Sequence, residues 1–159
     1  MKCLLFQDKT IEWINDLTSF GSLPFYGAVM MLFLFINDIL TFFKLLLSLI
    51  LVIAITFVIR SIYFKVRPEN KGKKKMYGKT LERLDASSFP SVHAARTAVL
   101  AVLLYSTITT GWMLIFSICF LFVVMTTRLF LKKHDIIDVL CGALLGFIIG
   151  YVFFISLTW

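Results

Sequence analysis

Long stretches of apolar residues recur along the whole chain, and they decide what this chain can fold into. They cover residues 22–36, 39–64, 90–110, 112–127 and 136–157. Because 60% of the 159 residues are hydrophobic and only 16% are charged, the chain has more apolar material than a soluble core of this size can bury. The sequence therefore predicts an all-α integral membrane helical bundle.

The five stretches predict about five transmembrane helices. The first of them, residues 22–36, is short for a hydrocarbon core that usually needs about 20 residues. Gly111 predicts a tight turn, so that the stretches on either side of it pack antiparallel. Residues 9–19 carry apolar side chains at helical spacing and predict an amphipathic helix at the interface. With no flexible linker in sight, we expect one domain, residues 1–159, with a polar loop at about 65–89.

A stripe of small residues follows the last stretch. Gly142, Gly146 and Gly150 recur every four residues, which places them on one face of a helix. Such a face lets another helix approach closely. We favour packing inside the bundle over a contact between two copies of the chain.

The positive charge is concentrated between the second and third stretches. The net charge is +7, and eight basic residues fall there: Lys65, Arg67, Lys71, Lys73, Lys74, Lys75, Lys79 and Arg83. This cluster fits an anionic partner at the membrane, either lipid head groups or a phosphorylated substrate. An ordinary solvated loop would look the same, and nucleic acid is not an expected partner.

Polar residues inside or beside membrane spans are costly unless they pair or line a wet cavity, so they are candidates for function. Here they gather at the ends of spans that meet at one membrane face. His134 and Asp138 are four residues apart and share a helix face, so the carboxylate can orient the imidazole. A neutral imidazole held this way is a competent nucleophile toward phosphorus.

The other residues of the cluster complete a set for phosphoryl transfer. His93, the second of only two histidines in the chain, can serve as the acid that protonates the leaving oxygen and later as the base. Guanidinium groups suit the phosphoryl oxygens, and the chain places three at these span ends: Arg60, Arg67 and Arg128. Arg96 either contacts the substrate or pairs with an acidic neighbour. We expect no metal and no cofactor. The three cysteines have no metal-ligand spacing.

Three motifs resemble the type 2 phosphatidic acid phosphatase (PAP2) superfamily of membrane lipid phosphatases. The first, a lysine, six residues and Arg-Pro, is matched by Arg60 through Arg67-Pro68. The second, Pro-Ser-Gly-His, is matched by residues 90–93. The third, Ser-Arg, five residues, His, three residues and Asp, is matched by residues 127–138. The resemblance implies catalytic roles for His134, Asp138 and His93 and a phosphate contact for Ser91.

The chain departs from the family pattern at three positions. Arg60 replaces lysine and keeps the charge, and Thr127 replaces serine and keeps a hydroxyl. Val92 replaces glycine, which narrows the approach of the backbone to phosphate and weakens the case for Ser91. Because both histidines and the aspartate are present, the resemblance implies an active enzyme.

The resemblance implies a metal-independent lipid phosphatase that works through a phosphohistidine, and it leaves the substrate open. We favour a polyprenyl (undecaprenyl-type) diphosphate, because a minimal chain suggests a site that contacts little beyond phosphate and tail. The alternatives are phosphatidylglycerol phosphate, phosphatidic acid and lipid A 1-phosphate. A non-catalytic protein that binds or translocates phospholipid is the hypothesis of another class, and a small channel is a third.

The resemblance and the charge distribution disagree about the membrane side. We expect a multi-pass protein of the cell (inner) membrane, and bacterial relatives commonly carry their site on the extracytoplasmic face. Nearly all Lys and Arg residues, however, fall on the side of the site, which indicates the cytoplasm. We favour the extracytoplasmic face and leave the oligomeric state open.

Overall fold

The computed structural model describes residues 13–70 and 82–156, apart from positions 83, 85 and 109. Every long element in that part of the chain is a helix, which confirms the all-α fold: α2 (Leu23–Phe35), α3 (Ile39–Ile62), α5 (Val92–Thr107), α6 (Gly111–Phe130) and α7 (Ile136–Ser156). A short 3-10 helix, η1 (Pro68–Asn70), follows α3. Four helices begin after a residue whose side chain caps an amide three positions on, namely Ser22, Asp38, Ser91 and Thr110.

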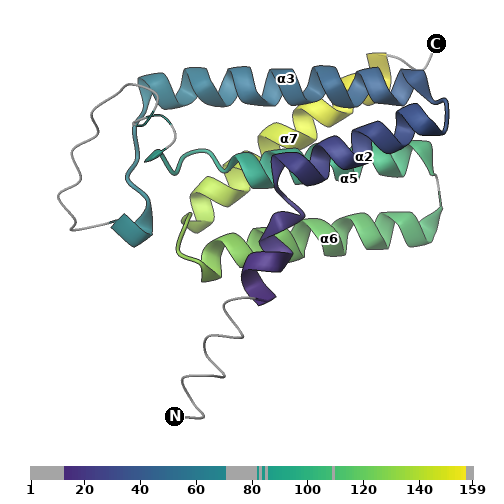
Figure 1. Ribbon diagram of the computed structural model, residues 1–159. Helices are drawn as coiled ribbons and strands as arrows, with labels where there is room; N and C mark the ends of the chain where they lie inside the picture. The colour runs from purple at the N-terminus through teal and green to yellow at the C-terminus, as the bar shows by residue number, and fades with distance from the viewer. Residues whose placement is uncertain (1–12, 71–81, 83, 85, 109, 157–159) are drawn as a thin grey trace, which may run out of the picture.

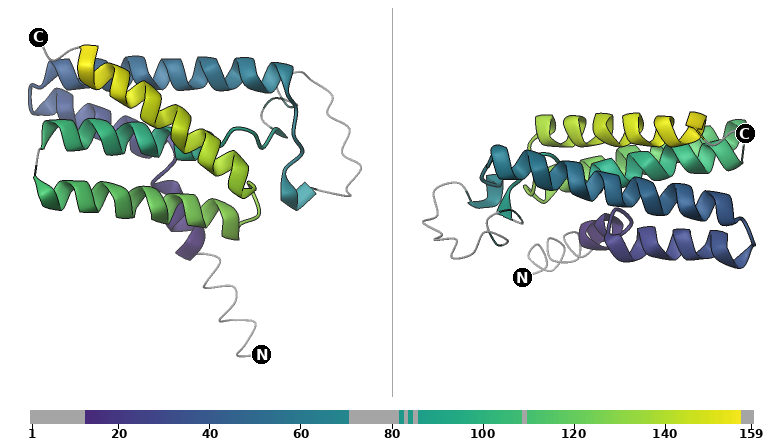
Figure 2. Two further views of the ribbon diagram at one scale, coloured as in Figure 1. Left: turned by 180° about the vertical axis from the view of Figure 1, so that it is seen from behind. Right: turned by 90° about the horizontal axis from the view of Figure 1, so that it is seen from above.

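The helices run side by side, and α7 crosses the others obliquely (Figures 1 and 2). The last turns of α3 and α6 and the first turns of α5 and α7 lie at the same end of the bundle (Figure 1). α5 occupies the centre and contacts α3, α6 and α7. Residues far apart in the sequence therefore meet around the N-terminus of α5.

Within the described residues, three helices are long and apolar enough to cross a membrane: α3, α6 and α7. α2 and the helical segment Trp13–Ser19, which are bent by 44° at the break between them, together form a fourth candidate span. α5 is apolar but has only 16 residues. This arrangement agrees with the expected number of about five spans. Of the expected interfacial helix, residues 13–19 are helical, residues 9–12 lie outside the described residues, and its place at the interface stays a prediction.

The outward faces of the helices are apolar. Phe35, Ile62 and Trp112 are each at least 82% exposed, and many other large apolar side chains are exposed along the same helices. A water-soluble monomer rarely exposes apolar surface on this scale. Together with the long apolar helices, these faces identify an integral membrane protein.

The glycine stripe of α7 faces α5, as expected for packing inside the bundle. A Cβ atom on Gly142 would overlap the carbonyl oxygen of Ser91, and one on Gly146 would overlap that of Ala95. At Gly150 the nearest group is the Val102 side chain, 3.0 Å away. The two helices are therefore in backbone contact near the start of α5.

Most of the basic loop, residues 71–81, lies outside the described residues. Its expected contact with anionic lipid or substrate thus stays a prediction.

Candidate active site

Both histidines and the arginines predicted from the sequence meet in one cavity at the N-terminus of α5. The cavity has a volume of about 170 Å³ and is lined by Arg60, Arg67, Val92, His93, Arg96, Arg128 and His134. α6 continues to Phe130, so Arg128 lies in the last turn of that helix. A cation in the last turn also complements the negative end of the helix dipole.

The segment before α5, residues 84–90, connects the first motif, at the end of α3, to the second motif, at the start of α5. Val66 and Ser87 form an isolated antiparallel bridge, and the amide of Ser88 donates to the Lys65 carbonyl at 2.8 Å. The Arg60 guanidinium donates to the carbonyls of Leu84 at 3.2 Å and Pro90 at 3.1 Å. Arg60 therefore both lines the cavity and fixes residues 84–90 against the end of α3.

The hydrogen bonds of His134 determine which ring nitrogen faces the cavity unprotonated. Nδ1 lies 2.6 Å from the Ser88 carbonyl oxygen. Because a carbonyl only accepts, Nδ1 carries the proton, and Nε2 of the neutral ring carries the lone pair and can accept from a donor. The Arg128 Nη2 group lies 3.4 Å from Nε2. The lone pair of a potential nucleophile therefore points toward the arginines.

The surroundings of His134 keep its ring neutral. Burial and then the charge of Arg128 lower the pKa of His134 from 6.5 to about 4, although the Ser88 carbonyl and Asp138 raise it in part. The side chain is almost fully buried. At neutral pH the imidazole is thus unprotonated and able to attack.

Asp138 is placed differently from our expectation. Its Oδ2 atom lies 3.9 Å from His134 Nδ1, which is longer than a hydrogen bond, because the Ser88 carbonyl occupies that position. The fully buried carboxylate instead accepts from Lys65 Nζ at 2.6 Å and from the Asp135 amide at 3.0 Å. Asp138 remains close enough to stabilise a positive imidazole electrostatically.

Lys65 is the residue that the sequence reasoning missed. It pairs with Asp138 and also with Asp135, at 3.2 Å. Burial lowers its pKa, but the hydrogen bonds and charges of these two carboxylates outweigh burial and raise it, so Lys65 stays charged. The one feature of the sequence that could have indicated a role for Lys65 in the site is its position inside the first motif, two residues before Arg67.

Ser91, expected as a phosphate contact, does not line the cavity. Its buried hydroxyl accepts from the Ala94 amide at 3.5 Å and caps α5. Its own amide donates to the main-chain carbonyl of Asp138 at 2.9 Å. Ser91 thereby ties the start of α5 to α7.

Arg96 faces the cavity, and the acidic neighbour considered for it is not found among the described residues. Its side chain is 7% exposed, and its buried Nε atom has no hydrogen-bond partner. The ion pairs found in the described part of the chain involve other residues. Of the two possibilities for Arg96, a substrate contact is the one that fits this geometry.

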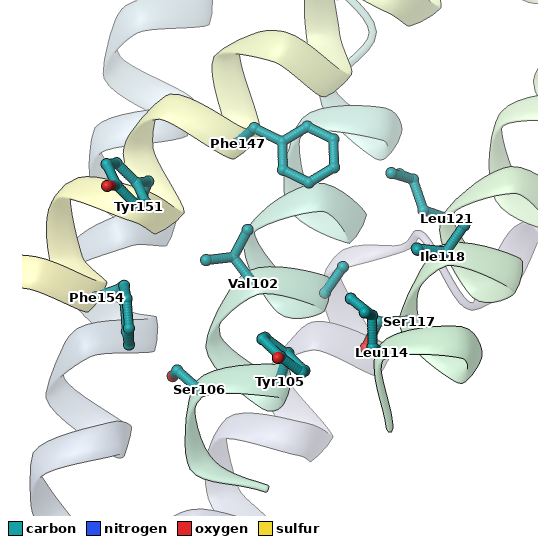
Figure 3. Close-up of a pocket in the computed structure, with 11 residues that line it drawn as sticks. Val102, Tyr105, Ser106, Leu114, Ser117, Ile118, Leu121, Phe147, Tyr151 and Phe154 are labelled. Atoms are coloured by element: carbon teal, nitrogen blue, oxygen red, sulfur yellow. The ribbon is translucent and has the colours of Figure 1, made fainter. Parts of the chain in front are cut away.

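A second cavity lies farther along the helices and has a different character. It has a volume of about 260 Å³, lies among α5, α6 and α7, and is lined mainly by apolar and aromatic side chains (Figure 3). No histidine, carboxylate, lysine or arginine is among the residues that line it. Within the described residues, no group of three His, Cys, Asp or Glu side chains could hold a metal ion.

The comparisons with known proteins agree with the motifs. A family model described as the PAP2 superfamily matches residues 41–159. This range contains every residue that lines the polar cavity. Neither the comparison with curated proteins nor that with solved structures gave a match.

Proposed function

The chain belongs to the PAP2 superfamily, and from this premise we propose that it is a membrane lipid phosphatase with His134 as its nucleophile. Membership implies phosphatase activity on phosphorylated, lipid-like substrates in a bilayer. The observation that carries the histidine mechanism is the Nε2 lone pair of His134, directed into a cavity with four arginines.

In the first step, Nε2 of His134 attacks the terminal phosphorus of the substrate. A P–N bond forms, the P–O bond to the leaving group breaks, and its electron pair stays on the leaving oxygen. His93 donates a proton to that oxygen. Arg67 and Arg128 stabilise the negative charge on the phosphoryl oxygens during the transfer.

In the second step, water attacks the phosphohistidine. His93 takes a proton from the water, the P–N bond breaks, and inorganic phosphate leaves. Between the two steps the His134 ring is positively charged, and the Asp138 carboxylate at 3.9 Å stabilises it. Lys65 holds that carboxylate in place, and neither step requires a metal.

We favour a polyprenyl diphosphate as substrate and the extracytoplasmic face of the cell membrane as the place of reaction. The four cationic groups of the cavity, with no acidic residue among those that line it, support a strongly anionic head group.

To test on which side of the membrane the site lies, a single cysteine would replace Lys132, which is exposed in the turn before His134, in a chain without its natural cysteines. Labelling by an impermeant maleimide in intact cells supports the extracytoplasmic face, and labelling only after lysis contradicts it.

The test of the function is phosphate release by purified protein in detergent with a chelator present. The substrates are an isoprenyl diphosphate, phosphatidylglycerol phosphate, phosphatidic acid and lipid A. The variants are His134→Gln, which should abolish release, and His93→Gln, which should accumulate a phosphoenzyme because its hydrolysis lacks a base. Phe130→Leu, at a 75% exposed position in the same region, is the matched control and should keep full activity.

The phosphoenzyme can be identified by its stability, since phosphohistidine survives alkali and is lost in acid. Unchanged release by His134→Gln would overturn the nucleophile. No release from any lipid by folded protein that still binds the lipids would favour the non-catalytic binding protein.

A further inference from the structure

The four arginines of the cavity differ in how they are placed relative to the two histidines. Arg67 and Arg128 act electrostatically on His134, and Arg128 also contacts its Nε2 atom. Arg128, then Arg96 and Arg67 act electrostatically on His93, and Arg60 acts on Arg96. Arg67 and Arg128 therefore act on both histidines, and Arg96, three residues after His93 on α5, lies beside the general acid.

Arg96 is available to bind an anion. It is nine-tenths buried, it lines the cavity, and its Nε atom has no hydrogen-bond partner. A buried guanidinium without an acidic partner is costly unless an anionic ligand completes its environment. It lies three residues after His93, so the two side chains lie on one side of α5.

We propose that Arg96 binds the leaving phosphate of a diphosphate ester and makes the enzyme selective for diphosphates over monophosphates. This inference rests on the proposed function, because it assumes that His134 attacks the terminal phosphorus and that His93 serves the leaving oxygen. In a diphosphate, that oxygen bridges to a second phosphate group. The second group then lies next to His93, on the side of α5 where Arg96 also lines the cavity.

Arg96 would act on the bond that breaks. When His134 forms the P–N bond, the electron pair of the bridging P–O bond passes to the lipid monophosphate, whose charge increases. A guanidinium beside this group stabilises the added charge, so less proton transfer from His93 is needed. A monophosphate substrate has a lipid alkoxide as its leaving group and places no phosphate near Arg96.

The experiment compares farnesyl diphosphate with farnesyl monophosphate, which share one tail. kcat/KM is measured for the wild type, Arg96→Gln, Arg96→Lys and, as the matched arginine that contacts His134 Nε2, Arg128→Gln. We expect Arg96→Gln to lower kcat/KM for the diphosphate about 10- to 100-fold, the range for one charge-assisted hydrogen bond, and to affect the monophosphate far less. Arg96→Lys should restore part of the loss, and Arg128→Gln should lower both activities alike.

Binding of inorganic diphosphate and inorganic phosphate to the same proteins, measured by calorimetry, gives a readout that does not need turnover. We expect the wild type to prefer diphosphate and Arg96→Gln to lose this preference. An equal loss of both lipid activities in Arg96→Gln, or an unchanged preference for inorganic diphosphate, would overturn the inference. A wild type that hydrolyses neither lipid would overturn the proposed function, whereas the calorimetry still decides the role of Arg96.

Discussion

The ion pair between Lys65 and Asp138 allows a quantitative test of how the site is held together. The Asp138 side chain is completely buried, the Lys65 side chain is 22% exposed, and their charged atoms are 2.6 Å apart. Replacing Lys65 with Met leaves a buried carboxylate without its cation. Breaking a fully buried pair in this way costs about 3–5 kcal/mol.

The structure sets the expected cost below the upper end of that range. Lys65 is partly exposed, and Asp138 keeps its hydrogen bond from the Asp135 amide, so we expect Lys65→Met to cost about 2–4 kcal/mol. Asp138→Asn should cost less, about 1–2 kcal/mol, because Lys65 still has Asp135 at 3.2 Å. The double variant should cost at least about 1 kcal/mol less than the sum of the two single variants.

The assay is unfolding in a detergent mixture of fixed composition, followed by circular dichroism, together with phosphate release. The control is Lys133→Met, whose partner Glu69 lies at 2.7 Å in a pair with both side chains about one-third exposed, so the cost should stay below about 1 kcal/mol. The double variant should regain stability but not activity, because the carboxylate near His134 is still missing. If the loss of stability in the double variant equals the sum of the losses in the two single variants, Lys65 and Asp138 are not energetically coupled, and the reasoning is refuted.

Two further predictions concern the nucleophile and the packing of α7. In a His93→Gln variant, the only histidine signal in an NMR titration should report a His134 pKa near 4, because burial and Arg128 oppose its protonation. The ring would then be about 90% neutral at pH 5, where an ordinary histidine is about 3% neutral, and a midpoint near 6.5 would contradict the geometry. Gly146→Ala should lower the stability by about 1–3 kcal/mol, because the new methyl group meets the Ala95 carbonyl. Gly27→Ala has open space around it and should raise the stability by up to about 1 kcal/mol. Thermal unfolding should therefore show a lower midpoint temperature for Gly146→Ala and a higher one for Gly27→Ala.

The fold was largely predictable from the sequence because lipid-facing helices must be apolar along their whole length. The stretch at 136–157 gave α7 to within a residue, and its glycine stripe gave the contact with α5. The cavity was predictable for a similar reason, since polar side chains at span ends must share a wet site. His93, His134 and the three arginines of the motifs all line it.

The features of the site that could not be predicted from the sequence depend on the course of the backbone or on which of several hydrogen-bond partners a side chain selects. Spacing placed Asp138 on the same helix face as His134, but it could not reveal that Lys65 takes the carboxylate. Likewise, the Ser91 hydroxyl could have faced a substrate or the start of its own helix, and only the geometry shows that it caps α5. Arg96 had no motif to support it, and its role depends on where its side chain lies.

The acceptor that orients His134 is a peptide carbonyl, and this affects how the site would respond to genetic variation. Any small residue at position 88 supplies the same oxygen, so substitution scanning should record tolerance at a position that orients the proposed nucleophile. Loss or insertion of a single residue between 84 and 90 would instead move that oxygen and the carbonyls that hold Arg60. Selection on this segment therefore acts on its length and backbone conformation more than on the identity of its residues. Sequence conservation at single positions of an alignment would underestimate its importance.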